Sequence, residues 1–150
     1  DRLGVKLGLP FPAGPSLERL AHETRETVPV ATFHRGGMVS FSGPLTALEK
    51  RVGEVSPAVL ARTCFASIAR TLVKWIRWAE ESHSTRELLI VGGVAANQLI
   101  REILQEQLPA WKLYFAAPRY SVDNAYGAAF FSFVSSGKAG EAFAATYFSE

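Results

Sequence analysis

Leu88-Leu89-Ile90-Val91-Gly92-Gly93-Val94-Ala95-Ala96-Asn97 is the stretch of this 150-residue chain that decides the fold. Its large apolar residues stop at two glycines, which predicts a buried strand, and a helical composition resumes after Asn97. Glycine lets the backbone turn tightly or approach a ligand closely, and the free amides of such a turn suit an anion such as a phosphate. The alternative is that Gly92 and Gly93 only make a strand-to-helix turn.

The residues that follow predict a crossover unit. Residues 111–115 form a second short strand, so strand, helix and strand over 88–115 indicate a mixed α/β sheet. Asp123 and Asn124 then stand at the start of a helix of small residues that runs to about Val134. If the two strands are neighbours, Asp123 and the glycine turn open at the same end of the sheet. Asp123 is then either a helix N-cap or a ligand for a metal or a phosphate.

The first part of the chain predicts mainly helices. Residues 1–8 indicate the tail of a helix, and Ser16 is a candidate cap for a short helix over 17–21. Residues 27–33 and 38–42 predict two strands of a hairpin.

Two more helices are expected before the central stretch. Residues 45–51 predict a short helix, and Ser56-Pro57 opens a long one whose apolar residues recur at steps of three and four. The other side of the long helix is basic and either contacts RNA or is only solvated; it carries Arg62, Arg70, Lys74 and Arg77. His22 and His34 are expected at the surface.

Composition excludes several classes of protein. With 48% hydrophobic and 20% charged residues the chain can bury a core, and its net charge of +2 neither requires nor excludes nucleic acid. A single cysteine, Cys64, excludes an internal disulfide and, with three histidines, leaves no Cys/His zinc cluster. No apolar run reaches the length of a membrane span, so we expect a soluble, cytoplasmic protein. The abrupt start at Asp1, without Met or signal peptide, indicates a piece of a longer chain.

Taken together, five stretches in order resemble the TsaD family, the universal proteins that make threonylcarbamoyladenosine in tRNA and were formerly described as glycoprotease-type peptidases. These stretches are Asp1-Arg2, residues 7–15, residues 40–43, residues 92–97 and residues 118–124. The resemblance implies the actin-like ATPase fold of sugar kinases, with two α/β lobes. This chain would supply part of the second lobe: a helical insertion with a short hairpin over 1–84, then the closing α/β part over 85–150.

The resemblance also implies roles for matching residues. Asp1, Gly92, Gly93 and Asn97 would hold the nucleotide part of a threonylcarbamoyl-adenylate, and Asp123 would be a ligand of an iron or zinc ion. The family's other metal ligands, an HxxxH pair, belong to its first lobe and are absent here. The chain alone is therefore expected to be inactive, with no catalytic residue of its own.

The implied activity is transfer of the threonylcarbamoyl group to an adenosine of tRNA. The implied partners are tRNA, a smaller TsaB-like homologous subunit and a P-loop ATPase. The alternative is a non-catalytic, nucleotide-binding scaffold that assembles with partner subunits. Metal-dependent proteolysis is less favoured, because neither HExxH nor a catalytic triad is present.

Two departures from the family pattern affect the site. The family usually reads DNGAM at the metal aspartate, and here the ring of Tyr126 follows close to Asp123. The family's GGVSAN reads GGVAAN, which removes one hydroxyl.

Overall fold

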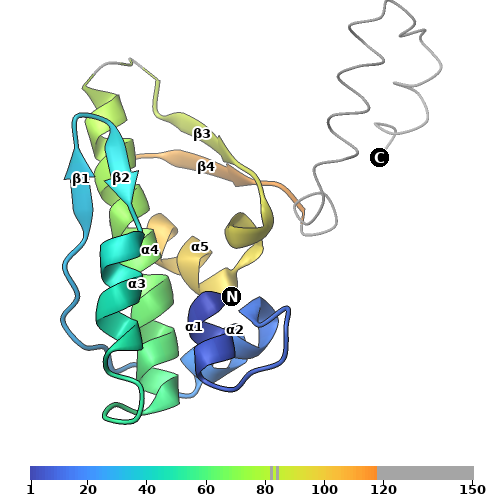
Figure 1. The fold of residues 1–150 in the computed structure, drawn as a ribbon. Coiled ribbons are helices and arrows are strands. Elements are labelled where there is room, and N and C mark those ends of the chain that lie inside the picture. Colours follow the sequence, from blue (N-terminus) through green and yellow to red (C-terminus); the bar gives the residue numbers. More distant parts are fainter. Residues whose placement is uncertain (82, 84, 118–150) are drawn as a thin grey trace, which may run out of the picture.

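The long helix α4 (Pro57–Glu80) is the element on which the other elements assemble. The computed structural model describes residues 1–81, 83 and 85–117. Figure 1 shows α3 and the β1–β2 hairpin on one side of α4, and α2 and α5 on the other. As predicted, Ser56 precedes the helix, a proline stands in its first turn, and its apolar residues face the core.

Three short helices and a hairpin surround α4. They are α1 (Arg2–Lys6), α2 (Gly14–His22), β1 (Phe33–Arg35), β2 (Met38–Ser40) and α3 (Ser42–Glu49). The hairpin is antiparallel, with His34 opposite Val39. The hairpin packs closely on α4, because a Cβ added to Gly37 would lie only 2.5 Å from the ring of Trp78.

The remaining elements form the expected crossover unit. They are β3 (Glu87–Ile90), the 3-10 turn η1 (Gly93–Ala96), α5 (Gln98–Gln107) and β4 (Lys112–Phe115). The two strands pair in parallel, with Glu87 opposite Lys112 and Ile90 opposite Phe115. The prediction that the two strands are neighbours is therefore confirmed, and their carboxyl ends lie at the same edge of the sheet.

The main core lies where α2, α4 and α5 meet. Its fully buried members include Ala21, Ala61, Ala69, Leu99 and Leu104. A smaller cluster of Leu3, Leu48 and Leu60 joins α1, α3 and the start of α4.

Polar residues inside the core are satisfied within α4. The hydroxyls of Thr63 and Thr71 donate to the carbonyls four residues earlier, at 2.7 and 2.8 Å. Thr63 also accepts from the amide of Val28 at 3.0 Å, which holds the extended segment before the hairpin. These bonds explain how a helix with several buried hydroxyls packs on more than one side.

Several local predictions need correction. Ser16 does not cap α2, because the helix begins two residues earlier and its first amides bond to the side chain of Asp1. Of the strand expected over 27–33, only Phe33 lies in β1. The amide of Val28 donates to the hydroxyl of Thr63 in α4 and not to a neighbouring strand. The helix expected over 45–51 is α3, shifted toward Ser42.

His34 is not the free surface residue that we expected. Its ring lies 6.0 Å from that of Trp78, centroid to centroid, and its Nε2 atom is buried without a hydrogen-bond partner among the described residues. His22 is exposed, as expected. Asp123 and its expected helix lie outside the described residues, and the division at residue 84 stays a prediction.

Candidate functional site

The turn after β3 has the conformation that its glycines allow. Gly92 has φ +105°, in the region that side chains rarely adopt, and η1 begins at Gly93. Gly92, Gly93 and Val94 are exposed, whereas Ala95 is buried. The turn therefore presents backbone to solvent at the carboxyl end of β3, where α/β sheets bind ligands.

Asn97 takes a structural part in this turn. Its Oδ1 atom accepts a hydrogen bond from the amide of Ile100 at 2.9 Å, which makes Asn97 the N-cap of α5. The residue is only 6% exposed. The side-chain oxygen of Asn97 is therefore engaged with α5.

The first amide of α5 is also occupied. Glu18 of α2 accepts from the amide of Gln98 at 2.7 Å, so a carboxylate of the chain itself lies on the positive end of this helix. An external anion would have to bind beside this carboxylate, at the Gly92-Gly93 turn, or replace it.

The carboxylate of Asp1 likewise accepts hydrogen bonds from amides at the start of α2. One of its carboxylate oxygens accepts from the amides of Ala13 and Gly14, at 2.7 and 2.9 Å. The sequence showed neither this contact nor the part of Gly14 in it, because the partners lie twelve and thirteen residues away. Asp1 is nevertheless exposed, so its carboxylate can also accept from a ligand hydroxyl.

Helix α2 brings the predicted nucleotide-binding residues to one part of the molecule. Gly14 at its start bonds to Asp1, and Glu18 one turn later bonds to Gln98, next to Asn97. One helical turn rises about 5.4 Å. Asp1, 96 residues before Asn97 in sequence, is thereby linked to the glycine turn through a single short helix, and Figure 1 shows the N-terminus beside the start of α5.

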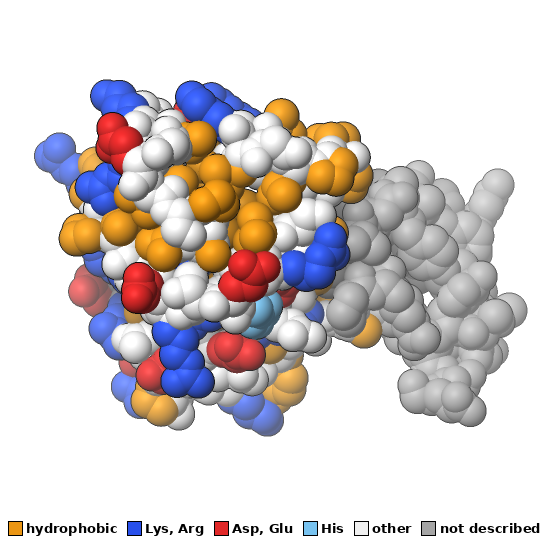
Figure 2. All heavy atoms as spheres, turned by 90° about the horizontal axis from the view of Figure 1, so that it is seen from below, with side chains coloured by type: hydrophobic (Ala, Val, Ile, Leu, Met, Phe, Trp, Pro, Cys, Tyr) orange, Lys and Arg blue, Asp and Glu red, His pale blue; other side chains and the backbone are white. Residues whose placement is uncertain are grey.

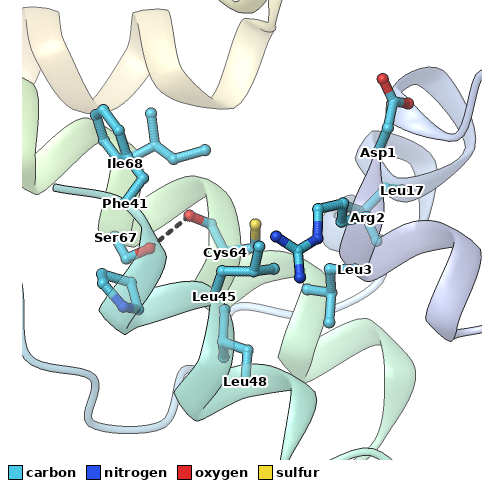
Figure 3. A pocket seen from close by; sticks show the side chains of 11 residues that line it. Asp1, Arg2, Leu3, Leu17, Phe41, Leu45, Leu48, Cys64, Ser67 and Ile68 are labelled. Carbon is cyan, nitrogen blue, oxygen red and sulfur yellow. Dashed lines mark hydrogen bonds between the residues drawn. The ribbon is translucent and has the colours of Figure 1, made fainter.

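An apolar cavity of about 260 Å³ adjoins Asp1. Figure 3 shows that the guanidinium of Arg2 reaches over it and that the carboxylate of Asp1 points away from that guanidinium. Cys64 and Ser67 also line it, and the hydroxyl of Ser67 donates to the carbonyl of Cys64 at 2.8 Å. Burial raises the pKa of the Cys64 thiol to about 11, which favours the protonated thiol over the reactive thiolate at neutral pH.

The basic side of α4 is partly used inside the protein. Lys74 donates to the hydroxyl of Thr32 at 2.7 Å, and Arg77 donates to the carbonyl of Gln107 at 2.9 Å.

In Figure 2 hydrophobic side chains form a band across the face seen from below Figure 1, bordered by charges of both signs. That face therefore lacks the uniform positive charge typical of nucleic-acid binding.

Arg101 is a residue of this region that the sequence did not indicate. Its Nε atom donates to the carbonyl of Ala95 at 2.6 Å, its Nη2 atom donates to the carbonyl of Ala116 at 2.9 Å, and its guanidinium lies 4.9 Å from the ring centre of Phe115. No sequence signal could have revealed this, because an arginine on an amphipathic helix is usually solvated and both acceptors are backbone atoms of alanines.

The described part of the chain does not form a metal centre by itself. Within residues 1–81, 83 and 85–117, no three His, Cys, Asp or Glu side chains lie together so that they could hold an ion. None of the helices in this part has the length and apolarity needed to cross a membrane.

Comparison with known proteins decides the family. The family model described as TsaD, tRNA N6-adenosine threonylcarbamoyltransferase, matches residues 1–130. The chain belongs to the TsaD family. The resemblance inferred from the five stretches is thereby confirmed.

Curated TsaD relatives match most of the chain. The tRNA N6-adenosine threonylcarbamoyltransferases of Enterococcus faecalis (strain ATCC 700802 / V583) and Geobacillus kaustophilus (strain HTA426) are 39% and 34% identical to it, over 140 and 138 residues. In both cases the match covers 83% of this chain and 40% of the relative. The chain thus spans 40% of the length of these relatives.

Two further matches widen the comparison. A probable bifunctional tRNA threonylcarbamoyladenosine biosynthesis protein of Methanosarcina mazei is 32% identical over 129 residues, which is 83% of this chain and 23% of that protein. Among solved structures, that of T.kodakarensis HypF superposes with a TM-score of 0.60 at 19% identity, over 69% of this chain and 14% of that one. The structural likeness supports the expected α/β fold.

Proposed function

We propose that the complete protein transfers a threonylcarbamoyl group to an adenosine of tRNA, and that this chain holds the nucleotide part of a threonylcarbamoyl-adenylate. The observation that carries the proposal is the link, through α2, between Asp1 and the Gly92–Asn97 turn in a member of the TsaD family. The Enterococcus faecalis and Geobacillus kaustophilus relatives are tRNA N6-adenosine threonylcarbamoyltransferases by name, which supports the choice of substrate.

In this proposal each residue contacts or supports a different part of the nucleotide site. The exposed backbone of Gly92 and Gly93 faces the phosphate, because amides in such a turn form a concave positive patch. The Asp1 carboxylate, already fixed by two amides, accepts from a hydroxyl of the ribose. Asn97 shapes the turn by capping α5. The chain's own groups therefore bind and orient, and the remaining chemistry belongs to the rest of the protein.

The nucleotide site is tested by titration of AMP and ATP against the complete protein and its Gly93→Val variant. We expect the variant to bind roughly tenfold more weakly, because a branched side chain at Gly93 obstructs the approach of a phosphate to the turn. Ala110→Val, in the exposed turn between α5 and β4, adds a branched side chain at the far end of α5 and is the control that should bind as the wild type does. Equal affinities for wild type and Gly93→Val would remove the turn from the site.

A non-catalytic scaffold is the second candidate. It is favoured by the departure from the family's DNGAM pattern, which places the ring of Tyr126 close to Asp123 in sequence. A complete protein that binds the nucleotide but transfers no threonylcarbamoyl group to tRNA would support the scaffold and contradict the transferase.

Asp123 as a ligand of iron or zinc is a separate proposal, since the described residues hold no metal cluster. If it is a ligand, Asp123→Ser in the complete protein should lose its metal and keep its stability, because serine can cap a helix but binds these ions poorly. Metal stoichiometry and the denaturation midpoint are measured together, with Asp123→Ala alongside. Full metal occupancy in the serine variant would contradict the proposal.

The proposed partners are tRNA, a TsaB-like subunit and a P-loop ATPase, and for the last two the resemblance is the only basis. Of these, tRNA agrees with the names of the relatives.

A further inference from the structure

Arg101 ties together two backbone segments that lie far apart in sequence. Its carbonyl partners belong to Ala95, in η1 directly after the glycine turn, and to Ala116, directly after β4. The guanidinium is planar and rigid, so two hydrogen bonds from two of its nitrogens fix both segments relative to α5. The amide of Ala116 also donates to the carbonyl of Ile90 at 3.1 Å, which closes the same edge of the sheet.

The charge of Arg101 is not neutralised by a neighbouring carboxylate within the described residues. Its hydrogen bonds there go to carbonyl oxygens, and its third contact is the face of Phe115. An arginine remains protonated at all physiological pH values. A full positive charge therefore stands half-buried behind the turn whose exposed face is formed by Gly92 and Gly93.

We propose that Arg101 is a positioning residue that holds the Gly92–Asn97 turn in the conformation that binds an anion and adds its charge to the attraction. The inference about anion binding rests on the proposed nucleotide site. The inference about the turn's conformation rests on the two hydrogen bonds alone.

The chain offers a matched control. Arg77 also donates to a backbone carbonyl, that of Gln107 at 2.9 Å, but this acceptor is the last residue of α5, at the opposite end from the turn. Arg77→Met therefore removes the same charge and a similar bond, away from Gly92 and Gly93.

The first experiment measures the dissociation constant of AMP for the complete protein. Arg101→Met should bind about tenfold more weakly, because it loses both the charge and the two-point contact. Arg101→Lys keeps the charge but has a single side-chain nitrogen in place of the two guanidinium nitrogens that bond to the carbonyls. Its affinity should therefore fall between those of wild type and Arg101→Met. Arg77→Met should bind as wild type does. Wild-type affinity in Arg101→Met, or an equal loss in Arg77→Met, would overturn the proposal.

The second experiment needs no nucleotide. Hydrogen exchange in the free protein is measured at the amides of Ala95 and Asn97, which donate to the carbonyls of Gly92 and Val94. These amides should exchange about tenfold faster in Arg101→Met and at the wild-type rate in Arg77→Met. Unchanged exchange in Arg101→Met would overturn the positioning role. A wild-type protein that does not bind AMP, with faster exchange in Arg101→Met, would overturn the proposed function and leave the positioning role standing.

Discussion

Replacing Leu99 by alanine is expected to lower the free energy of unfolding by about 3 kcal/mol. Leu99 is fully buried in the main core, two residues after the Asn97 cap, and it belongs to the cluster in which α5 meets α2 and α4. Truncation removes buried methyl groups and leaves a cavity that the surrounding core fills only in part. The measurement is chemical denaturation with a common m-value.

The matched control for Leu99 is Leu89→Ala. Leu89 has the same side chain but is 64% exposed on β3, so its truncation should change the free energy of unfolding by less than about 0.5 kcal/mol. Equal losses for the two variants would mean that the core is not centred where α5 meets the other helices.

Gly4→Ala is expected to destabilise the protein by about 2 kcal/mol, although alanine is the better helix former. A Cβ added to Gly4 in α1 would lie 2.5 Å from the Cβ of Ala13. Both positions are buried, and Ala13 carries one of the two amides that bond to Asp1. The clash would therefore push the start of α2 away from the Asp1 carboxylate.

The control for Gly4 is the complementary change in its partner. Adding Ala13→Gly to Gly4→Ala removes the methyl group that collides, so the double variant should recover most of the lost stability. The coupling energy in this double-mutant cycle should exceed about 1 kcal/mol. Additive effects of the two substitutions would contradict the contact between α1 and the start of α2.

Local patterns predicted most of the elements but not the contacts between them. The apolar period of α4 and the order of strand, glycines and helix around Gly92 follow from side chains close in sequence, and the structure confirms them. The burial of the strand was predicted wrongly, because Leu89 and Val91 are 64% and 60% exposed in the described part of the chain, where β3 has one neighbouring strand. The cap of α2 was predicted wrongly as Ser16, because the true acceptor, Asp1, reaches it across a loop.

The candidate site shows the same limit. The local pattern indicated Gly92 and Gly93, and the resemblance added Asp1 and Asn97. Their link through α2 depends on the carboxylates of Asp1 and Glu18, whose partners lie 12, 13 and 80 residues away. Glu18 and Arg101 gave no signal in the sequence, because a charged residue on a helix looks the same whether it meets water or a distant backbone group.

The glycine turn lies between two segments that are buried to different extents. On one side, Leu89 and Val91 are 64% and 60% exposed in the described part of the chain, and on the other side Leu99 and Leu104 of α5 are fully buried in the main core. The Asn97 cap and the bond from Arg101 to Ala95 join the turn to α5, so the turn keeps its conformation while α5 stays packed. A ligand that binds the turn therefore also stabilises the packed state of α5, and the free energy of unfolding should rise with the ligand concentration.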